Sequence, residues 1–251
     1  MVAQFRPRMA SRAARWLGTL DSLHLSSVPG MLPRMGSHSQ ASASLTTGLE
    51  AVEDILSFAK GGRGKPSKQE NSLFVASVAL SYAVWENFVE DLAIETTQVL
   101  SAHLRPERVP DACREHIEEK RSAWELAIYP GWQALWVSLV RDFAKGKPGD
   151  ERYSFHTADS KGVTKLFGRV GVDPFHDLPA AKREELNELV ELRGQIVHTG
   201  SPPDHFRKRD AISSLALVRE LASHLDRVVG DQIVEMTEVG PPALWPGGGS
   251  P

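Results

Sequence analysis

The chain has 251 residues, of which 41% are hydrophobic and 24% are charged, and these are the proportions of an ordinary soluble protein with one main domain. Its formal net charge of −3 and isoelectric point near 6.3 exclude a protein that coats nucleic acid by bulk electrostatic attraction, although they allow a local basic site. The single cysteine, Cys113, excludes a disulfide framework and a cysteine-based metal site, and it favours a cytoplasmic setting.

The two ends of the chain differ in composition from the middle. Residues 1–43 are rich in Arg and Ser and have Asp21 as their only acidic residue, so we expect a disordered N-terminal extension. An organelle transit peptide has a similar composition and is the alternative. Residues 239–251 contain a Gly-Gly-Gly-Ser run and predict a flexible tail. The expected folded domain therefore covers residues 44–238.

The first two helices are predicted from apolar periodicity. Apolar residues recur at three- and four-residue intervals from Leu45 onwards, which predicts a helix to about Lys60. A second helix is predicted over residues 67–103, where two apolar stripes indicate packing from more than one side, as for a central bundle helix. Its longest apolar stretch, residues 73–85, is shorter than the roughly 20 residues that a membrane span needs, so we expect a buried helix and no membrane.

The rest of the chain also has helical patterns. Helices are predicted over residues 111–128, 132–144 and 160–170, from Pro179 to the Gly200 stop, and from the Ser201-Pro202-Pro203-Asp204 start signal to about Glu238. Trp124, Trp132 and Trp136 are spaced as in a packed helical stripe, which favours core or subunit contacts over a base-stacking surface. No strand pattern of useful length is present, so the predicted fold class is all-α.

Arg193 and His198 are the candidate catalytic pair, close to the end of a predicted helix. A guanidinium group can hold phosphate charge, and an imidazole can transfer a proton near neutral pH. Five residues advance a helix by roughly 500°, so the two side chains point about 140° apart and lie about 7.5 Å apart along the axis. They can meet at one atom if the last turn unwinds, or if two copies of the helix face each other across a symmetric dimer. Such residues also occur at helix C-termini without any function.

Three segments of the chain resemble the HEPN superfamily, over roughly residues 45 to 230. Arg193 to His198, followed by Thr199-Gly200, resembles its Arg-x4-6-His motif. Residues 83–92 resemble the earlier central helix of the RiboL-PSP-like branch, and residues 165–172 resemble the short element before the motif helix. The resemblance implies an up-and-down helical bundle with a long central helix, which forms a homodimer with both motifs in one cleft. It also implies a metal-independent endoribonuclease of a toxin–antitoxin or antiphage defence system.

The resemblance also implies roles for individual residues. Arg193 would bind the scissile phosphate, and His198 would transfer protons while the RNA 2′-hydroxyl attacks, leaving a 2′,3′-cyclic phosphate. Glu86 would orient Arg193 through a charge-assisted hydrogen bond. No metal or cofactor is expected. The expected partners are RNA, a second copy of the chain and an antitoxin or defence protein.

Two further expectations concern binding. Gln195 and the basic residues Arg207, Lys208 and Arg209 are candidate RNA contacts, although such a charge run is often only a solvated helix face. Active HEPN proteins often have a polar residue directly after the arginine, where this chain has Gly194. This difference favours a second hypothesis, a non-catalytic HEPN-like module that binds a nucleotide, RNA or a protein partner. A third hypothesis is that the His198 region accepts or transfers a nucleotidyl group.

Overall fold

The structure is a computed structural model, and it describes residues 39–59, 66–120, 131–146, 154–204 and 206–237. Within these ranges the chain forms seven α-helices, one short 3-10 helix and no strand, which confirms the all-α fold class. Residues 1–38 and 238–251 lie outside the described ranges, and with them lies most of the expected N-terminal extension and the expected C-terminal tail.

Helix α1 (Gln40–Ser57) begins inside the segment that the sequence assigned to the extension. Ser39 caps the helix by accepting a hydrogen bond from Ser42 N, and its hydroxyl donates to the buried carboxylate of Asp226. The Glu95 carboxylate accepts from the amides of residues 40 and 41. The folded domain therefore begins several residues earlier than expected, because distant carboxylates bind a helix start that has little apolar patterning of its own.

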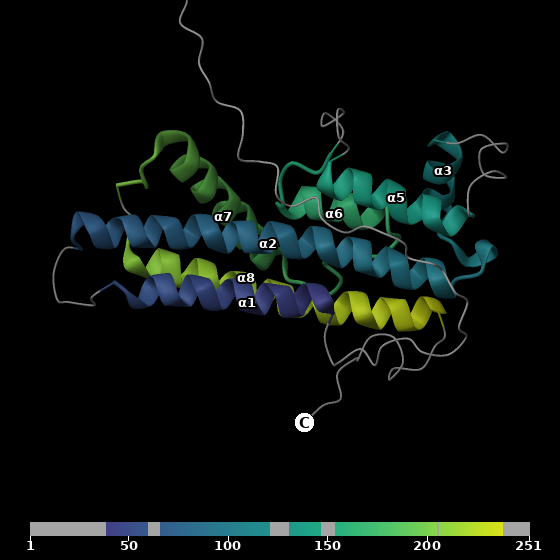
Figure 1. Ribbon diagram of the computed structural model, residues 1–251, viewed down its shortest axis with the longest axis horizontal. Helices are drawn as coiled ribbons and strands as arrows, with labels where there is room; N and C mark the ends of the chain where they lie inside the picture. The colour runs from purple at the N-terminus through teal and green to yellow at the C-terminus, as the bar shows by residue number, and fades with distance from the viewer. Residues whose placement is uncertain (1–38, 60–65, 121–130, 147–153, 205, 238–251) are drawn as a thin grey trace, which may run out of the picture. The chain divides into compact units, whose positions relative to one another are not determined.

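Helix α2 (Lys68–His103) is the central element of the fold and matches its predicted range. It begins with a capping box, in which Ser67 and Glu70 each bind the other's backbone amide. It contacts α1, α5, α6, α7 and α8. Figure 1 shows α1 and α8 running along one side of α2, with α5 on the other. These neighbours account for its two apolar stripes.

By length and composition, α2 is also the one helix of the described ranges that is apolar enough to cross a membrane. A core helix meets the same criterion. Fourteen α2 residues are buried within the protein, and its polar residues Ser67 and Glu70 cap its first turn. The packing of α2 against five helices therefore explains its composition.

The remaining helices follow the order predicted from the sequence, except for the 3-10 helix η1, which was not predicted. They are η1 (Pro106–Arg108), α3 (Asp111–Lys120), α5 (Trp132–Lys145), α6 (Ser160–Gly168), α7 (Ala180–Thr199) and α8 (Lys208–Thr237). Residues 121–128 of the predicted helix 111–128, with Trp124, lie outside the described ranges. The predicted start of α8 at residues 201–204 is wrong. The Asp210 carboxylate accepts a hydrogen bond from Arg207 N, and this side-chain cap fixes the first turn further along the chain.

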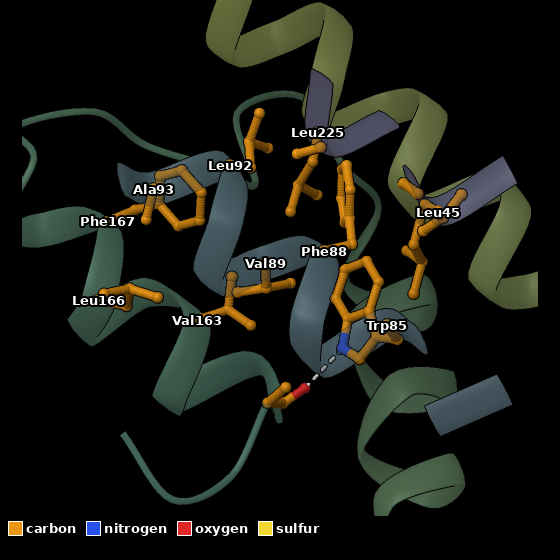
Figure 2. Close-up of a cluster of buried hydrophobic side chains, with 14 of the residues drawn as sticks. Leu45, Trp85, Phe88, Val89, Leu92, Ala93, Val163, Leu166, Phe167 and Leu225 are labelled. Carbon is orange, nitrogen blue, oxygen red and sulfur yellow. Dashed lines mark hydrogen bonds between the residues drawn. The ribbon is translucent and has the colours of Figure 1, made fainter. Parts of the chain in front are cut away.

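The core extends from α1 through α2 to α6 and α8. Figure 2 shows Trp85 and Phe88 of α2 between Leu45 of α1, Leu225 of α8 and side chains of α6. Trp136 of α5 is also buried, and its indole N–H donates to Arg169 O at 2.9 Å, so this tryptophan packs inside the subunit as a core residue.

The single cysteine is part of the core. Cys113 of α3 is buried, with its Sγ 3.3 Å from the main-chain oxygen of Arg169. Burial raises the pKa of the Cys113 thiol to about 11, so the group is a neutral thiol at physiological pH. Cys113 is therefore a packing residue of the core.

Candidate functional site

Arg193 projects from the face of α7 that packs against α2. Leu186, Leu189 and Ile196 are buried on this face, and their spacing of three, four and three residues places Arg193 among them. The Arg193 side chain is half-buried, and its guanidinium carbon lies 4.9 Å from the ring centroid of Tyr82. The cation therefore stacks on an aromatic ring that belongs to α2.

Tyr82 is held in place at its hydroxyl end. Its hydroxyl donates to Glu86 Oε1 at 3.0 Å and accepts from Ala158 N at 2.9 Å. Burial raises the pKa of the Tyr82 phenol well above its ordinary value, and the nearby Glu86 carboxylate adds to this effect, whereas Arg193 opposes it. The phenol therefore remains protonated and remains a donor to Glu86.

The expected direct hydrogen bond between Glu86 and Arg193 is not formed among the described residues. Glu86 instead accepts from Tyr82, one helical turn earlier, and Tyr82 carries Arg193 on its ring. Glu86 thus acts on the arginine through the tyrosine, because the carboxylate and the guanidinium bind different parts of the same side chain. In the sequence, Tyr82 is only one residue of an apolar stripe in the predicted helix over residues 67–103.

His198 lies at the exposed end of α7, in its last turn. The helix continues to Thr199 without unwinding, and Gly200 closes it in the left-handed region with a φ of 68° while its N–H donates to Ile196 O. Within one chain the imidazole and the guanidinium therefore remain about 140° apart around the axis. Val197, beside the histidine, is a 54% exposed apolar residue.

Gly194 leaves open space beside the motif arginine. Apart from its own helix backbone and its two chain neighbours, a Cβ atom added at this position would have no heavy atom within 4 Å, and the residue lies inside a regular helix. Position 194 can therefore accept a side chain without a steric clash.

We expect Gly194→Ala to raise the free energy of unfolding by about 0.5–1 kcal/mol, because alanine loses less backbone entropy than glycine on forming a helix. Urea unfolding followed by circular dichroism measures the change. The matched control is Gly200→Ala, which also has open space but a φ of 68°, so it should destabilise the protein by about 1 kcal/mol. A destabilised Gly194→Ala protein would contradict the free space at this position.

The other candidate RNA contacts lie apart from the pair. Gln195 is exposed on α7. Arg207 donates to the main-chain oxygens of Asp204 and Phe206, whereas the exposed Arg209 lies 3.6 Å from a carboxylate oxygen of Asp210. The Lys208 ammonium lies 6.0 Å from the ring centroid of Phe74. Arg207 and Arg209 therefore contact local groups at the start of α8, whereas Lys208 lies near an aromatic ring of α2.

The segment of residues 154–160, which the sequence analysis did not single out, connects α2 to α7. Both main-chain polar groups of Ala158 are hydrogen-bonded to α2. Its N–H donates to the Tyr82 hydroxyl, and its oxygen accepts from the Trp85 indole at 2.9 Å. Two residues later, Ser160 N donates to Asn187 Oδ1 of α7 at 3.0 Å. Residues 154–160 are thus tied to both helices that carry the candidate site. Figure 2 shows the bond of Trp85 to this segment.

A hollow of about 420 Å³ between α7 and α8 includes neither Arg193 nor His198. Its apolar lining is bordered by the carboxylates of Glu185, Glu188 and Asp210, which would repel phosphate. The candidate phosphate site is therefore on the Tyr82 side of α7. Among the described residues, no group of three His, Cys, Asp or Glu side chains could hold a metal ion.

Comparison with known proteins gives a match to a family model described as RiboL-PSP-HEPN, over residues 48–231. The matched range includes Glu86, Arg193 and His198, and it extends from α1 to the last part of α8. No curated protein and no solved structure matches the chain.

Proposed function

The chain belongs to the RiboL-PSP-HEPN family, and from this premise we propose that it is a metal-independent endoribonuclease. The observation that carries the proposal is the state of Arg193. Its guanidinium is fixed on the Tyr82 ring, and among the described residues no carboxylate forms an ion pair with it. A positioned cation that lacks a counter-ion is suited to binding a phosphate.

The proposed reaction is an internal transfer within the RNA. The 2′-hydroxyl oxygen attacks the adjacent phosphorus atom, the bond to the 5′-oxygen breaks, and the products are a 2′,3′-cyclic phosphate and a free 5′-hydroxyl. Arg193 stabilises the charge that develops on the phosphate oxygens. His198 transfers a proton, either from the 2′-hydroxyl or to the leaving 5′-oxygen.

We further propose that the active form is a homodimer. The helical last turn of α7 keeps the two groups of one chain apart, whereas two motifs that face each other can combine an arginine and a histidine from different chains. The exposed apolar side chain of Val197, next to His198, supports a partner surface at this end of the helix.

The test is cleavage of RNA by the purified full-length protein in buffer that contains EDTA. We expect cutting of single-stranded RNA, with 2′,3′-cyclic phosphate ends identified by mass spectrometry of the fragments. DNA of the same sequence is the control, because DNA lacks the attacking hydroxyl and should remain intact. Cutting of DNA, or an absolute requirement for a divalent metal, would remove the proposal.

The proposed biological role is that of a toxin or an antiphage component acting on RNA in the cytoplasm, restrained by an antitoxin or another defence protein. Expression of the chain alone should then slow the growth of its host. Growth should recover when the catalytic residues are replaced, and normal growth with abundant active protein would argue against a toxic role.

A second candidate function is supported by Gly194. The position after the motif arginine has no side chain and is surrounded by open space, so one polar group that is common in active members is missing. The chain would then be a non-catalytic module that binds a nucleotide, RNA or a protein partner. Tight RNA binding without cleavage in any buffer would favour this function. Gly194→Asn would then be the informative variant, since it restores a polar group at little steric cost.

A further inference from the structure

A basic groove lies along α6, beside the segment that holds Tyr82. It consists of two adjoining hollows of about 400 and 220 Å³, which share Lys161 and Lys165. Arg183 of α7 completes the first hollow, whereas Phe143 and Phe155 form part of the second. We call this surface the α6 groove.

The three cations of the α6 groove have no carboxylate partner among the described residues. By contrast, Lys145, Lys182 and Arg219 each form ion pairs, at distances of 2.6–2.9 Å. The Asp159 carboxylate lines the second hollow, but it caps α6 by accepting from Gly162 N. One carboxylate against three cations leaves a net positive charge in this groove, in a chain whose formal net charge is −3.

Lys165 has local support, because it lies in the last turn of α6 and its ammonium is 5.4 Å from the Phe143 ring centroid, but the placement of Lys161 is unfavourable for folding. Lys161 and Lys165 are four residues apart on one helix, where like charges repel. Lys161 also lies in the first turn of α6, where the helix dipole disfavours a cation. An anionic ligand would offset both effects, so the pattern points to binding.

The groove is connected to the candidate catalytic site through residues 154–160. This segment contributes side chains to both hollows, and its Ala158 amide donates to the Tyr82 hydroxyl, whose ring carries Arg193. Arg183 lies on α7, the helix that also carries Arg193, and Asn187 between them binds Ser160 N. A polyanion bound at Arg193 can therefore continue along this segment into the groove.

We propose that the α6 groove binds the sugar–phosphate backbone of single-stranded RNA next to the scissile bond. Lys161, Lys165 and Arg183 supply the phosphate contacts. Phe143 and Phe155 are buried, so they do not offer open faces for base stacking, and the groove should bind phosphates without sequence preference. The identification of the polyanion as RNA rests on the proposed function, whereas the location of the anion site rests on the unpaired cations.

The test measures binding separately from cleavage. A fluorescent single-stranded oligonucleotide with 2′-O-methyl groups cannot be cut by 2′-hydroxyl attack, and its affinity is followed by anisotropy over a series of salt concentrations. The groove variant combines Lys161→Gln, Lys165→Gln and Arg183→Gln in the full-length protein. The control combines Lys182→Gln, Arg219→Gln and Arg227→Gln, which removes the same number of charges at sites already paired with carboxylates.

We expect the groove variant to bind on the order of tenfold more weakly, and its plot of log affinity against log salt to have a slope smaller by about 2, since each single-strand phosphate contact contributes about 0.7. The control should keep the slope of the wild-type protein. Thermal melting of both variants tests that they remain folded.

Equal losses in the groove variant and the control would overturn the proposal, because net charge alone would then explain binding. Displacement of the oligonucleotide by polyglutamate at the same charge concentration would also overturn it, in favour of a general site for acidic polymers. If binding depends on the groove but RNA is never cut, the groove stands and the nuclease proposal fails. If RNA is cut, and the groove variant binds and cuts it as the wild type does, the groove proposal fails and the nuclease proposal stands.

Discussion

Replacement of Arg193 by alanine is expected to slow RNA cleavage in EDTA by about a hundredfold to a thousandfold, the usual effect of removing one donor that stabilises transition-state charge. Replacement of His198 by alanine should slow it by about a hundredfold to ten-thousandfold, because proton transfer is lost. Initial rates at saturating RNA measure both effects. Arg193→Lys is the matched control for charge, and it should remain impaired because an ammonium cannot donate in the bidentate geometry of a guanidinium.

The two inactive variants also test how the site is assembled. If each active site combines Arg193 of one chain with His198 of the other, a mixed dimer of Arg193→Ala and His198→Ala contains one intact site. Random mixing should then restore about a quarter of the wild-type rate, as expected for a symmetric dimer with two shared sites. Mass spectrometry can show that the subunits have exchanged. If the rate still does not recover, both groups act within one chain.

Replacement of Trp85 by alanine is expected to lower the free energy of unfolding by about 3–5 kcal/mol, as large-to-small changes of buried aromatic residues do. The side chain is fully buried in the core of Figure 2, and its indole N–H satisfies the main-chain oxygen of Ala158. Urea unfolding measures the change. Phe58→Ala is the matched control, since this aromatic residue is 74% exposed and its loss should change stability by less than about 0.5 kcal/mol.

The Trp85→Phe variant separates the packing of the core from the positioning of Ala158 by the indole N–H. The phenyl ring keeps most of the buried volume but leaves Ala158 O without its donor, a loss of about 1–3 kcal/mol for an unsatisfied buried group. Because Ala158 also holds Tyr82, the rate of RNA cleavage should fall further than stability alone explains when it is measured where the variant is fully folded. Unchanged cleavage under these conditions would show that the segment does not support the site.

The helices that have strong internal signals were predictable from sequence. The range of α2 follows from its apolar stripes, and that of α7 follows from Pro179 at its start and Gly200 at its end. The start of α1 was missed because it depends on Asp226, which is 187 residues away in the sequence. The start of α8 was misplaced because a plausible proline signal precedes the real cap at Asp210.

The sequence indicated Arg193 and His198 as candidate site residues, but it did not indicate the contacts that they make. The spacing of Arg193 and His198 indicated that one regular helix cannot direct both at one atom, and the structure keeps that helix regular. The support of Arg193 by Tyr82 was not visible, because an aromatic residue in an apolar seam looks like any core residue. The α6 groove was missed for a similar reason, since unpaired lysines are recognised only when the positions of all nearby carboxylates are known.

The burial of Cys113 has a practical consequence for studies of this protein. Because its only thiol is protected, a cysteine introduced at position 194 would be the single accessible site for maleimide chemistry in the native state. Paramagnetic tags attached there would sit immediately beside the motif arginine in every copy. Their dipolar coupling in frozen solution would report directly whether two such arginines approach each other.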